Sequence, residues 1–242
     1  MNRCFLLMCL VLLAGPLAGR AAAANYFEDG LVAAKSGNAS EAVTLFEKEL
    51  KEQPAAGVYL DLGIVEWQQG HAGAAILAWE RATWIDPFDA RAAQNLKFAR
   101  ALTDRDEPEL RWYEQASTWL APDAWVLIAG ASLWLAVGAL VLPRVFRWRK
   151  SGWHQTLSAL GCCVFLFSLT ANIGVVTRTD IGFVLRKNAP VLLTPTSGGE
   201  VISTLQAGEP VRRLKVRGDY FYIRTAMNSG WIPREQVGLI SE

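Results

Sequence analysis

The sequence contains few residues that form disulfides or bind metals. Of its four cysteines, two lie in the first 24 residues, and Cys162 and Cys163 are adjacent in a long apolar run. The two histidines, His71 and His154, lie far apart, so the ligand spacing of a metal site is absent. The polar parts of the chain therefore have no disulfide framework, and we expect no metal and no cofactor.

Charged residues are missing from two long stretches, one between Trp125 and Leu142 and one between Gln155 and Thr177. The whole chain is 52% hydrophobic, with a net charge of +1, which does not indicate nucleic-acid binding. Residues 25–118 hold 16 acidic and 9 basic side chains, whereas residues 178–242 hold 6 acidic and 9 basic ones. We therefore expect polar domains around a localised apolar region.

The first 24 residues have the pattern of a secretory signal peptide. Arg3 precedes an apolar run from Phe5 to Leu13, and a stretch of small residues ends at Ala24. The run is short for a membrane span, which needs about 20 residues. The sequence predicts a signal peptide over 1–24 with cleavage near Ala24, and an uncleaved anchor is the alternative.

Residues 25–106 contain an internal repeat. Six residue pairs recur 33 positions apart: Tyr26/Tyr59, Gly30/Gly63, Gly37/Gly70, Ala42/Ala75, Phe46/Trp79 and Pro54/Pro87. Glycine permits close helix approach and ends helices, and proline stops them, so the pattern predicts two antiparallel helix pairs. An amphipathic capping helix is expected between Asp89 and Leu102. The segment resembles the tetratricopeptide repeat (TPR), so 25–106 is predicted to be an all-α TPR-like domain.

The TPR resemblance implies that the first helix of each pair lines a concave groove. Its candidate partner-binding residues are apolar: Phe27, Leu31, Leu60, Ile64 and Trp67. The lysine and asparagine positions of the family's carboxylate-binding subtype are missing, so we do not predict capture of a peptide carboxylate. The alternative is that these side chains only pack against other helices.

Two segments, 121–143 and 153–177, are predicted to form a transmembrane hairpin, because each is long and apolar enough to cross a bilayer. Tryptophans flank both ends of the first span, as expected at membrane interfaces. Segment 107–120 is predicted as an amphipathic linker helix, which either lies on the membrane surface or packs against the repeat domain.

The loop between the spans, 144–152, predicts the orientation. It contains no acidic residue and four basic ones: Arg144, Arg147, Arg149 and Lys150. The positive-inside rule places this loop in the cytoplasm. The chain is therefore expected to be a multi-pass protein of the bacterial inner membrane, with both folded domains on the periplasmic side.

Residues 183–242 change to a period-two pattern, and five short strands separated by turn signals predict a small all-β barrel. The elements 218–223 (GDYFYI) and 230–233 (GWIP) resemble a bacterial SH3-like domain. The resemblance implies binding of a peptide or of peptidoglycan, with Tyr220, Tyr222 and Trp231 as the candidate ligand surface. The alternative is that Trp231 and alternate strand residues fill the barrel core.

The order of these segments is similar to the E component of the Bacteroides aerotolerance operon. The resemblance implies a non-catalytic scaffold or adaptor in a cell-envelope complex, linked to stress or oxygen tolerance. It also implies protein partners, namely von Willebrand factor A-domain membrane proteins of the same operon, besides the lipid bilayer. The alternatives are a cell-wall-binding or wall-hydrolysis-associated protein acting through the SH3-like domain, and a transmembrane sensor. Neither histidine lies in the predicted barrel, and we predict no catalytic residue.

Overall fold

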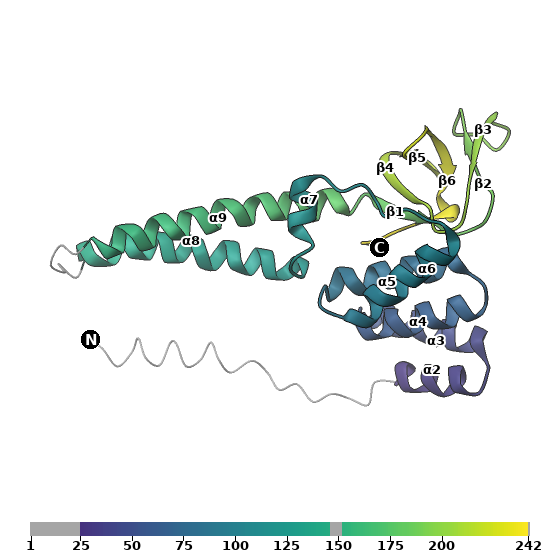
Figure 1. Cartoon of the computed structure of the whole chain (residues 1–242), viewed down its shortest axis with the longest axis horizontal. Helices are drawn as coiled ribbons and strands as arrows, with labels where there is room; N and C mark the ends of the chain where they lie inside the picture. The colour runs from purple at the N-terminus through teal and green to yellow at the C-terminus, as the bar shows by residue number, and fades with distance from the viewer. Residues whose placement is uncertain (1–24, 146–151, 242) are drawn as a thin grey trace.

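A computed structural model describes residues 25–145 and 152–241 (Figure 1). The predicted signal peptide and most of the loop 144–152 lie outside the described residues. The described chain contains eight α-helices and an antiparallel sheet. We refer to α2–α6 as the helical unit, to α8 and α9 as the hairpin, and to β1–β7 as the sheet unit. The prediction of helices, a long apolar hairpin and a separate sheet is therefore confirmed.

The helical unit follows the sequence repeat. Its elements are α2 (Tyr26–Lys35), α3 (Ala39–Glu52), α4 (Ala56–Gln68), α5 (Ala72–Ile85) and α6 (Ala90–Thr103). Just after α2 and α4, Gly37 and Gly70 have φ angles of 84° and 80°, a region that favours glycine. Pro54 and Pro87 follow the ends of α3 and α5. The 33-residue period therefore places equivalent turns at equivalent points.

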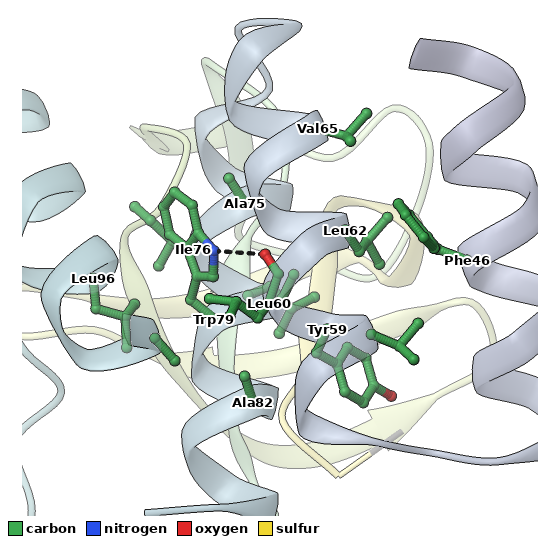
Figure 2. Close-up of a cluster of buried hydrophobic side chains, with 14 of the residues drawn as sticks. Phe46, Tyr59, Leu60, Leu62, Val65, Ala75, Ile76, Trp79, Ala82 and Leu96 are labelled. Atoms are coloured by element: carbon green, nitrogen blue, oxygen red, sulfur yellow. Dashed lines mark hydrogen bonds between the residues drawn. The ribbon is translucent and has the colours of Figure 1, made fainter. Parts of the chain in front are cut away.

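Each helix pair is closed by one glycine and one aromatic ring. A Cβ atom on Gly30 would lie 2.7 Å from Cε1 of Phe46, and a Cβ atom on Gly63 would overlap the indole ring of Trp79. The Trp79 Nε1–H also donates a hydrogen bond of 3.1 Å to the carbonyl oxygen of Leu60 (Figure 2). The glycine and the aromatic residue recur together because the ring occupies the space that a side chain would need.

The hairpin consists of α8 (Pro122–Val145) and α9 (Trp153–Arg178). Both helices are long and apolar enough to cross a membrane, over Pro122–Pro143 and Trp153–Arg178, with mean hydropathies of 2.2 and 2.0. Small residues bring them together: a Cβ atom on Gly161 would lie 3.0 Å from that of Ala136, and Ser158 Oγ donates to the Ala136 carbonyl at 3.1 Å. Close backbone approach of this kind is typical of paired membrane helices.

The sheet unit contains seven strands: β1 (Ile181–Val184), β2 (Ala189–Leu192), β3 (Val201–Leu205), β4 (Pro210–Arg217), β5 (Tyr220–Arg224), β6 (Ser229–Pro233) and β7 (Val237–Leu239). Their order is β3-β2-β6-β5-β4-β1-β7, and every pairing is antiparallel. The sequence predicted five strands and missed two short ones, β1 and β7. These are the first and last strands of the unit, and they pair with each other. β1 also begins at Ile181, before the predicted domain boundary at residue 183.

The helical unit packs on the sheet unit through α5. Ile76 and Leu77 of α5 belong to the same buried cluster as Ile181, Phe183 and Ile240. Two glycines bring the backbones close: a Cβ atom on Gly73 would lie 2.6 Å from the carbonyl oxygen of Leu185, and one on Gly238 would overlap Leu77. The Arg81 guanidinium donates a 2.7 Å hydrogen bond to the carbonyl oxygen of Leu239. The core of the helical unit thus extends to β1 and the end of β7, while the sheet unit has a second buried cluster of its own.

A short helix, α7 (Trp112–Ser117), joins the helical unit to the hairpin. It packs against α9, where a Cβ atom on Gly174 would overlap the carbonyl oxygen of Tyr113. Ser117 is buried at this contact, whereas Trp112 is 70% exposed. Leu110, just before α7, packs against the buried cluster of the helical unit, so the segment contacts both that unit and α9. Its predicted position on the membrane surface stays a prediction.

Ion pairs connect α7 and the hairpin to the sheet. Glu114 of α7 is fully buried and accepts hydrogen bonds of 2.7 and 2.9 Å from Arg212 of β4. Burial raises the pKa of Glu114, but the hydrogen bonds from Arg212 and the Arg111 backbone outweigh it and lower the pKa below its usual range. Arg213 pairs with Asp180 at 2.8 Å, directly after α9.

Candidate functional site

A groove with a volume of about 290 Å³ lies between α2 and α4 of the helical unit, on the inner side of α3. Its floor and walls combine apolar and charged side chains: Leu31, Ala34 and Lys35 from α2, Phe46 from α3, and Asp61, Ile64, Val65 and Gln68 from α4. The sheet unit packs on α5 through Ile76 and Leu77, and neither of these residues lines the groove. The groove is therefore open to a ligand in the folded chain.

Leu31 and Ile64 are the two predicted groove residues that line it. They lie 33 positions apart in the sequence, so each repeat contributes the same site. Ile64 is 37% exposed, which leaves apolar surface for a ligand to cover. Phe27, also predicted, lies one turn away, and its ring packs on that of Phe46 with the centroids 6.1 Å apart.

Leu60 and Trp67 are not placed in the groove. Leu60 is 3% exposed and belongs to the core, because its helix turns it toward α5, whose Trp79 bonds to its carbonyl group. The Trp67 ring packs between Trp79 and Phe98, with centroid distances of 5.9 and 6.0 Å. For these two residues the alternative of packing against other helices describes their position.

Three polar groove residues were missed from the sequence: Lys35, Asp61 and Gln68. Burial raises the pKa of Asp61, and the positive charge of Arg91 opposes that rise. A repeat signal was available, because Asp61 matches Glu28 and Gln68 matches Lys35 at the 33-residue offset. The groove therefore offers an apolar floor with a carboxylate and an ammonium group at its rim.

The outward face of the sheet carries the second set of predicted residues. Phe221, Ile223 and Ile232 fill the core of the sheet unit, so their neighbours Tyr220, Tyr222 and Trp231 alternate to the other face. Tyr222 and Trp231 are partners across β5 and β6, with ring centroids 5.1 Å apart. All three are partly buried, and Trp231 does not fill the core.

Basic residues flank these aromatic rings. Lys215 is the β4 partner of Tyr222, and Arg217 is the partner of Tyr220. Because paired residues of antiparallel strands point to the same face, the cations stand beside the rings. Such a surface can stack on a flat or sugar-like group and can attract an acidic one.

No group of three or more His, Cys, Asp or Glu side chains within residues 25–145 and 152–241 is placed to hold a metal ion. Comparison of the chain with protein-family models and with curated proteins finds no match. The function is therefore inferred from the groove and from the sheet face that carries Tyr220, Tyr222 and Trp231.

Proposed function

We propose that the chain is a membrane-anchored, non-catalytic adaptor whose TPR-like helical unit binds a protein partner in a cell-envelope complex. One observation carries the proposal: the α2–α4 groove remains open, while the sheet unit is packed on α5. The partner is inferred to present an apolar side chain to Leu31 and Ile64, with polar groups reaching Lys35 and Asp61.

In this proposal the hairpin crosses the inner membrane, with its basic loop in the cytoplasm. The helical unit and the sheet unit lie at the same end of the hairpin (Figure 1). This supports a location of both units on one side of the bilayer, and the basic loop supports the outer, periplasmic side.

The resemblance to the E component of the Bacteroides aerotolerance operon supports an identity for the partner. We infer that it is a membrane protein with a von Willebrand factor A domain. A role in stress or oxygen tolerance follows from the same resemblance.

Co-purification from membranes in a mild detergent tests the adaptor function. Ile64→Glu places a second carboxylate beside Asp61 in an apolar groove, and we expect it to abolish recovery of the partner. Thr44→Glu is the matched control, because Thr44 is exposed on α3 and does not line the groove. Partner recovery with Ile64→Glu at the wild-type level would contradict the proposal.

A second function, binding of the cell wall, is favoured by the outward Tyr222–Trp231 pair of the sheet unit, which we infer to be SH3-like. We expect titration of the full chain with peptidoglycan fragments to change tryptophan fluorescence. Trp231→Ala is expected to weaken binding by about 1–3 kcal/mol, the usual contribution of one stacked aromatic ring. Identical titration curves for the wild type and the variant would remove this candidate.

A further inference from the structure

Three aromatic side chains that nothing covers surround the junction of the hairpin with the folded units. Trp112, Trp119 and Phe88 are 70%, 61% and 75% exposed. A single exposed apolar residue is ordinary in any protein. Three large rings from three separate segments are informative if they lie around the same end of the hairpin.

Contacts with α9 fix the height of the two tryptophans. The Trp119 ring lies 6.1 Å from that of Phe167, centroid to centroid. Trp112 precedes Tyr113, whose backbone packs on Gly174. Phe167 and Gly174 both lie in the half of α9 that ends at Arg178, so the two tryptophans border this half of the helix, about two turns apart.

Contacts of α5 fix the height of Phe88. Gly73, near the start of α5, meets Leu185. Trp84, near the end of α5, lies 4.7 Å from the guanidinium of Arg178, at the end of α9. α5 therefore runs toward the hairpin, whereas β1 runs away from it. The turn after α5 therefore continues from Trp84 back toward the hairpin. Figure 1 shows this turn on the side of the helical unit that faces the hairpin. Phe88 lies in it, with its N–H bonded to Asp86 Oδ1 at 3.0 Å.

We propose that Phe88, Trp112 and Trp119 form a membrane-contact surface whose partner is the interfacial layer of the lipid bilayer. The inference rests on the proposed crossing of the membrane by the hairpin. Tryptophan rings favour this layer, because it accommodates both their apolar bodies and their N–H groups. Phenylalanine adds apolar area to such a contact. The surface is also continuous with lipid-facing residues of α8, where Val126 and Leu127 are 62% and 72% exposed.

The charges around the surface indicate that the contact is apolar and not electrostatic. Asp86 and Asp123 are exposed near the rings, and two exposed arginines of the same region already have partners: Arg111 bonds to the Tyr113 hydroxyl, and Arg91 pairs with Asp89. Anionic lipid headgroups would be attracted only weakly, because acidic and basic side chains are mixed around the rings. The contact should therefore persist at high salt, which screens surface charges over a few ångströms.

The test uses the full chain with its native cysteines replaced by serine and a bimane label at one new cysteine. The chain is reconstituted in vesicles of phosphatidylethanolamine and phosphatidylglycerol, with or without brominated acyl chains. Phe88→Cys reports on the proposed surface. Met227→Cys, at a site 92% exposed on the sheet unit, is the aqueous control, and Trp134→Cys, at a site 76% exposed on α8, reports on the crossing itself.

We expect brominated lipid to quench the label at 88 and at 134 but not at 227, and the quenching at 88 to be the same at low and high salt. Quenching at 134 without quenching at 88 overturns this inference and leaves the crossing intact. Absence of quenching at 134 overturns both. A label at 88 that is shielded from lipid and also from a water-soluble quencher means that protein, such as a second copy, covers the surface, and the proposal is then wrong.

Discussion

Helices α3 and α5 occupy the same position in the two repeats but have different surroundings. Each buries one small and one aromatic residue, Ala42 and Phe46 in α3 and their equivalents in α5. α5 buries further residues: Ile76 and Leu77 pack with the sheet unit, and Glu80 pairs with Arg100 of α6. The α3 counterparts, 33 positions earlier, are Val43, Thr44 and Glu47, of which the last two are exposed.

The comparison shows how one repeat serves two purposes. Both repeats have the same kinds of residue where the two helices of a pair meet. The residues on the outer side of the second helix are buried where a further unit docks and exposed where none docks. In the first repeat this side stays free, and the groove between α2 and α4 stays open as well.

The largest effect is expected when a charge is placed on the docked side. Leu77 is 6% exposed, so Leu77→Asp buries an unpaired carboxylate between α5 and the sheet. We expect a loss of about 3–5 kcal/mol of stability, measured by unfolding in detergent. Thr44→Asp, the same change at the exposed position of α3, should have almost no effect. Equal losses of stability in both variants would show that the outer sides of α3 and α5 do not differ in this way.

A smaller effect is expected at the ion pair that ties α7 to the sheet. Glu114→Gln removes the charge that Arg212 binds, and we expect it to cost about 3 kcal/mol at neutral pH. The folded chain holds the Glu114 proton less tightly than the unfolded chain does, because its pKa is lowered from 4.5. The stabilisation is therefore complete above pH 4.5 and is lost as the pH falls through the lower folded pKa.

The difference in melting temperature between the wild type and Glu114→Gln should accordingly shrink in acid. Glu109→Gln, at an exposed position of the same segment, should follow the wild type at every pH. A difference that stays constant down to strongly acidic pH would show that the Glu114 charge does not act in this way.

The smallest effect is expected at the feature that both repeats share. Gly30→Ala and Gly63→Ala each press a methyl group against the aromatic ring of Phe46 or Trp79, and we expect similar losses of about 1–3 kcal/mol. Gly57→Ala is the control, since its Cβ atom would meet no neighbouring atom within 4 Å. It should leave stability unchanged or raise it by about 0.4–1 kcal/mol. A loss in only one repeat would show that the two pairs are not packed alike.

The parts of the fold that depend on local pattern could be predicted from the sequence. The 33-residue period located the helix pairs, and the uncharged stretches located the hairpin. Strand alternation around Phe221 and Ile223 leaves the tyrosines on the outward face, as a period of two requires. Each of these signals lies within one segment.

The missed features join segments that are distant in sequence. Glu114 and Arg212 are 98 residues apart, and β1 pairs with β7 at the other end of the sheet unit. Glycine is required at positions 73 and 238 because α5 approaches the sheet closely there. No periodic pattern in the sequence predicts this approach. In the groove, Leu31 and Ile64 could be predicted, whereas Leu60 required knowledge of which side of α4 faces α5.

Photo-cross-linking from the groove in intact membranes tests the central claim most directly. A benzophenone amino acid is placed at position 64, in the groove, or at position 44, on the exposed side of α3. The account predicts that position 64 is cross-linked to a separate membrane protein with a von Willebrand factor A domain, and that position 44 is not. Absence of a cross-link at position 64, or the same product from both positions, would contradict it.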